Sequence, residues 1–164
     1  CFYGDIIRRY AKSTVKVILD ADQQALKEGA KALPYVLKPN NHELSALVGR
    51  KLETIFELRT EAQNLQQQGI SIVAVTLGAE GLLWVSNEGA YHTKPFPIKS
   101  LCTTGAGDGT LGAMLHGLLN NHKHEDIARA MTCAGTLTAM KTGTQVISLK
   151  ELNDNIFRIS IEIL

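Results

Sequence analysis

Short apolar runs alternate with longer segments of helical periodicity, and this alternation limits the fold more than any other feature of the sequence. The predicted strands are Thr14–Leu19, Tyr35–Lys38 and Ile70–Leu77. Helices are predicted before and between them, over Asp5–Lys12, Gln23–Ala32, the segment that Asn40 caps and Gly49 ends, and Glu53–Gln68. Such an alternation is typical of an α/β protein in which helices sandwich a mainly parallel sheet.

The pattern changes after Gly81. The runs Leu82–Ser86 and Ala90–Thr93 flank a turn-forming Asn-Glu-Gly and predict an antiparallel hairpin. After Gly109 every remaining element is predicted to be helical, over Leu111–Leu119, Glu125–Met140 and Leu149–Ile159. The sequence of 164 residues contains no repeat or linker, so we expect residues 1–164 to form a single domain.

The composition argues against two classes of function. Lys and Arg number 17 against 16 Asp and Glu, so the chain has no broad positive field to hold nucleic acid or an anionic membrane surface. The most apolar stretch, Ile70–Val85, is interrupted by glycines and a glutamate, and a bilayer span takes ~20 apolar residues. The cysteines form no C-x-x-C pair, which favours a reducing, cytoplasmic location. Because the chain starts at Cys1 rather than methionine, we expect that a preceding piece has been removed.

The most informative run is Thr103–Thr110, which reads TTGAGDGT and leads directly into an apolar helix. It places consecutive backbone N–H groups at a helix N-terminus, where the helix dipole also favours an anion. Such fixed donors stabilise a phosphoryl group during transfer. Asp108 lies within the run and can accept the proton of an attacking hydroxyl. The run therefore indicates an anion hole with an adjacent general base.

Simpler or different sites compete with this interpretation. The run is equally compatible with a glycine-rich turn in which Asp108 caps the following helix. Gly107, Gly109 and Gly112 match the dinucleotide pattern G-x-G-x-x-G in form, but no later strand ends in an acidic residue about 20 positions further on. A P-loop is excluded because no Gly-Lys-Ser/Thr closes a glycine loop.

Three blocks of the chain together resemble the ribokinase-like, or PfkB-type, carbohydrate kinases. Thr103–Asp108 (TTGAGD) is similar to the signature of that family, Lys38–Leu44 (KPNNHEL) to its K-P-N-x-x-E-L, and Thr76–Gly81 (TLGAEG) to its S/T-L-G-x-x-G. The order and spacing of the blocks match as well. Gly49–Leu52 and Leu82–Val85 are similar to the 1-phosphofructokinase branch in particular.

The resemblance implies a role for each block. Asp108 would be the catalytic base, and the amides implied to form the anion hole are those of Gly105, Ala106 and Gly107. Asn40 and Glu43 would place Mg²⁺ through water, although the same pair alone makes a helix capping box. The residues implied to line the ATP site are Lys38, Thr76, Gly78, Gly81, Thr104, Ala134, Thr138 and Gly143.

Structural explanations exist for several of these implied ATP contacts. Lys38 is alternatively a solvated strand end, and Gly78 with Gly81 a simple turn. The sequence also departs from the family in that Gly109 follows the base where serine or another small residue is usual, and Cys102 stands where aspartate or serine is common.

The resemblance covers only the C-terminal half of the family. The N-terminal half normally supplies the sugar-binding aspartate, the glycine-rich sugar loop and the lid strands. Without these neighbours, unpaired strand edges and apolar faces would be exposed, and such surfaces tend to associate with another chain. We therefore expect self-association or a complementary N-terminal half.

The implied activity is phosphoryl transfer from Mg-ATP to the 6-hydroxyl of fructose 1-phosphate. Tagatose-6-phosphate kinase is the alternative enzyme, because the same blocks serve both. A third possibility is a non-catalytic nucleotide-binding fragment that is inactive without the N-terminal half. The expected partners are a nucleotide and a small sugar phosphate, and neither nucleic acid nor a membrane.

Overall fold

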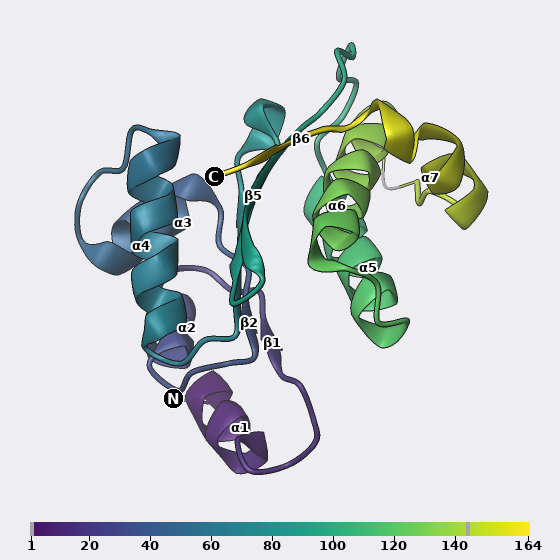
Figure 1. The fold of residues 1–164 in the computed structure, drawn as a ribbon. Helices are drawn as coiled ribbons and strands as arrows, with labels where there is room; N and C mark the ends of the chain where they lie inside the picture. The colour runs from purple at the N-terminus through teal and green to yellow at the C-terminus, as the bar shows by residue number, and fades with distance from the viewer. Residues whose placement is uncertain (1, 144) are drawn as a thin grey trace. The chain divides into compact units, whose positions relative to one another are not determined.

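The computed structural model of the chain describes residues 2–143 and 145–164 (Figure 1). The chain divides into two compact units, one formed by Cys1–Gly78 with Leu83–Ala90 and the other by Ala79–Leu82 with Tyr91–Leu164. Among the described residues, six strands are hydrogen-bonded in the order β1-β2-β3-β4-β5-β6, and seven α-helices accompany them. None of the helices in these ranges has the length and apolar composition that crossing a bilayer requires. The expectation of a single domain stays a prediction.

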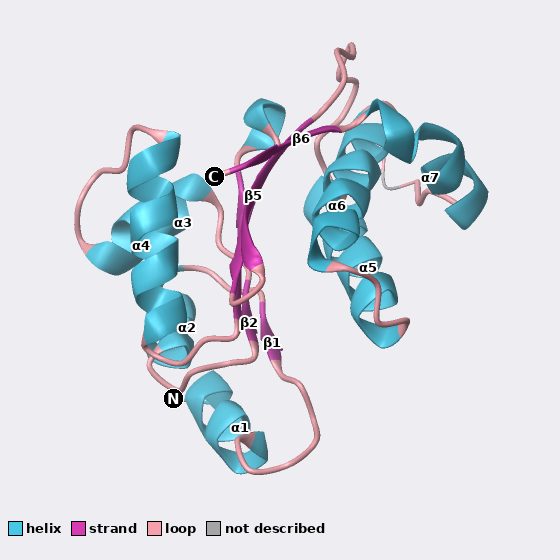
Figure 2. Ribbon diagram, viewed as in Figure 1, coloured by secondary structure: helices cyan, strands magenta, loops and turns pink. Residues whose placement is uncertain are grey.

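The first unit is built on three parallel strands, β1 (Ile18–Leu19), β2 (Val36–Leu37) and β3 (Ile72–Thr76). Leu19 is paired with Leu37, and Leu37 in turn with Val73. The helices of this unit are α1 (Phe2–Tyr10), α2 (Gln23–Ala30), α3 (Asn41–Val48) and α4 (Ile55–Gln67). Figure 2 shows α2, α3 and α4 gathered beside these strands. The prediction of an α/β fold with parallel strands is confirmed.

Local chemistry sets the boundaries of these helices. Asn40 and Thr54 begin α3 and α4 with capping boxes, in which each side chain accepts a hydrogen bond from the backbone N–H three residues on. Gly49 ends α3 with a φ of 76°, a left-handed conformation that favours glycine. Val36 and Leu37 are fully buried, as expected for a strand with a neighbour on each side.

The second unit contains most of the helical second half of the chain. Its helices are α5 (Ala106–Leu119), α6 (His124–Ala139) and α7 (Leu149–Asn155). The strands β4 (Leu82–Ser86) and β5 (Gly89–Lys94) each contribute residues to both units. Within the second unit, the buried Thr93 hydroxyl lies 2.6 Å from the Thr132 hydroxyl, which ties β5 to α6.

Helices α5 and α6 lie side by side (Figure 1) and pack closely because small residues face each other. A side chain at Gly117 would meet Ile127 at 2.7 Å, and one at Gly135 would meet Thr110 at 2.9 Å. Both distances are shorter than a normal van der Waals contact. The small residues of this pair of helices are therefore required by their packing.

Two sequence predictions are wrong in detail. The C-terminal segment is not helical to Ile159: α7 ends at Asn155, a short 3₁₀ turn follows, and β6 (Ser160–Ile163) pairs antiparallel with β5. The alternation Ser-Ile-Glu-Ile fits a strand, and the free edge of β5 supplies its partner. The strand predicted over Thr14–Leu19 is reduced to two residues, because β1 is first in the strand order and its partner β2 is itself two residues long.

Candidate functional site

The candidate residues of the first unit lie where parallel strands end. The N–H of Thr76, the last residue of β3, donates to the carbonyl of Pro39 at 2.9 Å, and Thr76 forms an isolated parallel bridge with Asn40. This pairing brings the start of α3 beside the end of β3. Gly78 follows with a φ of 60° and open space where a side chain would be. Lys38, Asn40, Thr76 and Gly78 are therefore brought to one edge of the unit.

Lys38 is not the solvated strand end that its position alone would allow. Its side chain is 6% exposed, and its ammonium nitrogen lies 2.9 Å from the Oδ2 of Asp20. The sequence reasoning missed Asp20. The register of β1 and β2 identifies this partner. Leu19 pairs with Leu37, so the next residues on these two parallel strands are Asp20 and Lys38.

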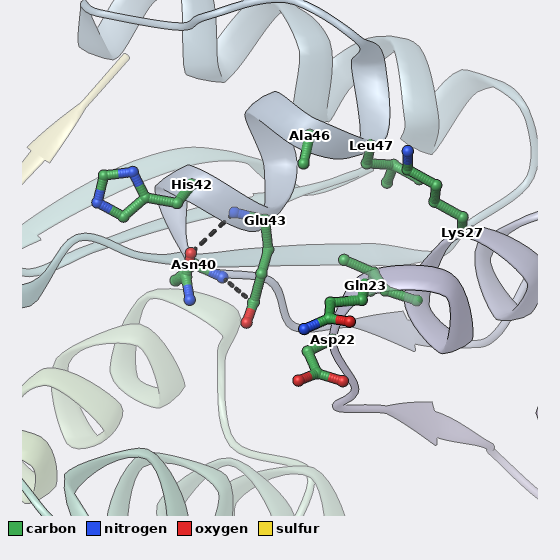
Figure 3. A pocket seen from close by; sticks show the side chains of 9 residues that line it. Asp22, Gln23, Lys27, Asn40, His42, Glu43, Ala46 and Leu47 are labelled. Carbon is green, nitrogen blue, oxygen red and sulfur yellow. Dashed lines mark hydrogen bonds between the residues drawn. The ribbon is translucent and has the colours of Figure 1, made fainter.

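Asn40 and Glu43 form the expected capping box at the start of α3 (Figure 3). The Oδ1 of Asn40 accepts from the N–H of Glu43 at 2.8 Å, and the Oε2 of Glu43 accepts from the N–H of Asn40 at 2.7 Å. In the part of the chain that the structure describes, the amide NH₂ of Asn40 and the Oε1 of Glu43 take no part in the box and are available for other partners.

A pocket of about 340 Å³ opens beside this capping box, between the N-terminal ends of α2 and α3. Asn40, Glu43 and His42 line it together with residues of α2 and its N-cap. Figure 3 shows the Glu43 carboxylate on the side of Asp22 and Gln23, while the His42 ring points away from it. A polar ligand in this pocket would meet the free oxygen of Glu43.

In the second unit, the glycine-rich run forms the N-terminus of α5. Gly105 is the N-cap, in a left-handed conformation with a φ of 81°. The N–H of Ala106 donates to the Thr103 carbonyl at 3.1 Å, so one of the three predicted anion-hole amides already has a partner. Among the described residues, the amides of Gly105, Gly107 and Asp108 have none. With respect to the described residues, three donors are thus available to an anion at this helix start.

Asp108 lies in the first turn of α5, and its side chain is exposed. Its carboxylate is thus next to the free amides of its own turn. A phosphoryl acceptor hydroxyl could reach this carboxylate from solvent.

Cys102 connects the run to the segment that follows α6. The pKa of its thiol is lowered, first by a hydrogen bond from the Thr104 side chain and then by hydrogen bonds from the backbone of Thr104 and of Gly143. The predicted residues Thr104 and Gly143 are thereby brought to the same sulfur atom. By contrast, burial raises the pKa of Cys133 to about 11.

A second pocket, of about 350 Å³, lies along α5. Five predicted residues line it: Thr104, Gly105, Asp108, Ala134 and Thr138. Sequence reasoning missed the opposite wall, which is formed by Gln145, Val146, Ile147, Ser148, Leu149 and Leu152. In the structure, two apolar residues of this wall are exposed, Val146 by 85% and Leu149 by 55%.

Gly81 has a structural explanation within its own unit. A side chain at this position would collide with the carbonyl of Thr93, and its φ of 95° also favours glycine. Strand packing alone therefore explains why this position requires glycine.

The predicted residues thus divide into two groups by the unit in which they lie. The first group is Lys38, Asn40, Glu43, Thr76 and Gly78, and the second is Gly81, Thr104, Gly105, Ala106, Gly107, Asp108, Ala134, Thr138 and Gly143. Across the described part of the chain, no three His, Cys, Asp or Glu residues are grouped to hold a metal ion. Parallel strands with helices beside them define an α/β protein, and a helix start such as that of α5 is a common place for an anion to bind.

Residues 4–151 match the family described as pfkB family carbohydrate kinase. The chain belongs to this family. It is 32% identical over 160 residues to the 1-phosphofructokinase of Escherichia coli strain K12, and the match covers 98% of this chain and 51% of that protein. It is 36% identical over 146 residues to the ATP-dependent 6-phosphofructokinase isozyme 2 of the same strain, covering 87% of this chain and 47% of that protein. The chain spans about half the length of the curated relatives it matches.

Solved structures of the family share the fold. The phosphofructokinase-2 of Escherichia coli in complex with potassium superposes with a TM-score of 0.90 at 32% identity, over 95% of this chain and 51% of that one. The ribokinase of Thermotoga maritima superposes with a TM-score of 0.68 at 25% identity, over 80% and 44%. The predicted ribokinase-like fold is confirmed, as a mixed sheet with helices.

Proposed function

We propose that the protein is an ATP-dependent sugar-phosphate kinase that transfers the γ-phosphoryl group of ATP to the 6-hydroxyl of fructose 1-phosphate. The observation that carries this proposal is the N-terminus of α5, where Asp108 adjoins backbone amides that have no partner among the described residues. Membership of a carbohydrate kinase family supports it, as does similarity to a 1-phosphofructokinase.

Asp108 would act as the general base. An exposed carboxylate can accept the proton of the sugar hydroxyl as that oxygen attacks the γ-phosphorus. The bond from the γ-phosphorus to the bridging oxygen then breaks, and ADP leaves. During transfer, the amides of Gly105, Gly107 and Asp108 would donate to the oxygens of the phosphoryl group, where negative charge is spread. Ala106 would contribute less than predicted, because its N–H is already bonded to Thr103.

The pocket along α5 would hold the nucleoside part of ATP. One wall includes four small residues, Gly109, Gly112, Ala113 and Ala134, which leave room for a ligand beside His116 and Thr138. Val146 and Leu149 line the same pocket from the opposite segment. A flat aromatic base fits between small residues and apolar side chains. Thr104 and Asp108 lie in the same lining, so the phosphates would point towards the start of α5.

Magnesium fits the residues present only through water and phosphate oxygens. The capping box already uses the Oδ1 of Asn40 and the Oε2 of Glu43, so one carboxylate oxygen of Glu43 remains for the water shell of the ion. Mg²⁺ would neutralise phosphate charge when bound. Within the first unit, the Lys38 ammonium has two further N–H donors beyond its bond to Asp20.

Tagatose 6-phosphate is the second candidate acceptor, and fructose 6-phosphate is supported by the similarity to a 6-phosphofructokinase. The family resemblance places the residues that read the sugar in the N-terminal half of such kinases. We therefore propose that the active form contains that half, either as part of the complete protein or as a partner chain. A fragment that binds nucleotide without catalysis stays the alternative for these 164 residues alone.

Titration calorimetry with ATP, with and without Mg²⁺, tests the nucleotide site of the folded chain. Saturable, magnesium-dependent binding supports the proposal. A panel of fructose 1-phosphate, fructose 6-phosphate and tagatose 6-phosphate on the complete protein then identifies the acceptor. No binding by the folded chain, together with no turnover by the complete protein, would contradict the proposed function.

Asp108→Asn in the complete protein tests the base. We expect kcat to fall by about 10² to 10⁴-fold, which is the usual contribution of a general base, while the Kd for ATP stays nearly unchanged. Asp126→Asn is the matched control, because Asp126 is also an exposed aspartate in the first turn of a helix, α6. Unchanged turnover in Asp108→Asn would remove this residue from the mechanism.

A further inference from the structure

The segment Gln145–Leu149 forms a wall of the pocket along α5 but has little backbone support of its own. Among the described residues, the backbone of Gln145, Val146 and Ile147 makes no hydrogen bond to other backbone groups. Most side chains of the segment are exposed, and Val146 is exposed by 85%. Some other contact must hold this wall in place if it is to bind a ligand.

Lys141 supplies that contact. It follows the end of α6, and its N–H donates to the carbonyl of Thr138, a residue on the opposite side of the same pocket. Its side chain is 22% exposed, and its ammonium group donates to the carbonyl of Val146 at 2.9 Å. Lys141 thus links the end of α6 to the unsupported wall.

Glu151 completes the link from the first turn of α7. Its Oε1 lies 2.8 Å from the Lys141 ammonium, and its Oε2 accepts from the N–H and the hydroxyl of Ser148 at 2.8 and 2.9 Å. These contacts lower the pKa of Glu151 to about 2, and the hydrogen bond from Lys141 is the largest cause. One lysine and one carboxylate therefore connect α6, the wall and α7.

We propose that Lys141 is a positioning residue for the nucleotide, which fastens the segment Gln145–Leu149 as the wall against which the base lies. This inference rests on the proposed function, since it assumes that the pocket takes a nucleotide. Lys141 touches no phosphate in this arrangement. It acts by keeping the wall in its binding-competent position before the ligand arrives.

The test is the affinity of Lys141→Met for two ligands, ATP and adenosine. If loss of the Lys141 contacts leaves the wall correctly placed in about one tenth of the molecules, the Kd for each ligand rises about tenfold. The factor should be the same for both ligands, because the wall faces the base. Lys141→Arg should bind within about threefold of wild type, since it keeps the charge and the donors. Glu151→Gln, which keeps an acceptor for Ser148, should weaken both ligands as well.

Lys150→Met is the matched control. Lys150 lies in α7 beside Glu151 and pairs with Asp154, but it is 84% exposed and does not line the pocket. We expect it to change neither Kd. Wild-type affinity in Lys141→Met overturns the inference, and so does a loss confined to ATP, which would mean that the lysine acts on the phosphates. Failure of the wild-type chain to bind either ligand would instead contradict the proposed nucleotide site.

Discussion

Gly109 and Thr138 face each other where α5 meets α6, and their contact explains why position 109 requires glycine in this chain. A side chain built on Gly109 would meet the hydroxyl oxygen of Thr138 at 2.7 Å. That hydroxyl is buried, and it donates to the Ala134 carbonyl at 2.8 Å. Thr138 occupies the space that a serine or alanine at position 109 would need. We therefore expect Gly109→Ala to destabilise the protein.

The size of the effect follows from three contributions. Replacing a helical glycine by alanine stabilises by about 1 kcal/mol. Displacing Thr138 costs its hydrogen bond, about 1 kcal/mol, and overpacking adds about 1 to 3 kcal/mol. The net change for Gly109→Ala is a loss of about 1 to 3 kcal/mol. In a Thr138→Ala background the collision is absent, and the same substitution should instead stabilise by up to about 1 kcal/mol.

Urea unfolding followed by circular dichroism measures this change of sign as a double-mutant cycle. Gly112→Ala is the control, because Gly112 lies one turn further along α5 and a side chain there has nothing within 4 Å. It should give the same small stabilisation in both backgrounds. If Gly109→Ala changes the free energy of unfolding equally with and without Thr138, the steric explanation is refuted.

Two further predictions concern the capping box and the cysteines. Asn40→Ala should lower the free energy of unfolding by about 1 kcal/mol and weaken Mg-ATP binding in calorimetry, whereas Thr54→Ala, which removes an equivalent cap on α4, should lower only the stability. Equal ATP affinity in the two variants would argue against a magnesium role for Asn40. Iodoacetamide should alkylate Cys102 well before Cys133, because the thiolate reacts and the pKa of Cys102 is lowered while that of Cys133 is raised to about 11. The Cys102 rate should therefore reach half its maximum below pH 9.0, and mass spectrometry that finds Cys133 modified first would contradict this order.

Much of the fold could be predicted from local features of the sequence. The cap at Asn40 and the stop at Gly49 lie within ten residues of each other, and both were predicted correctly. Such features depend on hydrogen bonds and φ preferences of neighbouring residues, so the sequence reveals them directly. The predicted helix boundaries around them consequently need only small adjustment.

The errors lie where distant residues decide the structure. Ser160–Ile163 becomes a strand because β5 offers a free edge, and helical periodicity in the preceding residues concealed this. Asp20 was missed as the partner of Lys38 because their contact depends on the register of two parallel strands. Lys141 and Glu151 were missed for a similar reason, since neither belongs to a motif and their link forms only when α6 and α7 are in place.

The two walls of the pocket along α5 differ in how much side chain can be removed from them. Gly109, Gly112 and Ala134 are already among the smallest residues, and their helices are packed closely. Leu149, on the other wall, is 55% exposed and can be shortened without opening a cavity in the core. In the proposed nucleotide site, acceptance of an ATP analogue with an enlarged base is therefore most simply engineered from the α7 side. If the pocket is the proposed nucleotide site, an inhibitor would distinguish this chain chiefly through its contacts with Val146 and Leu149.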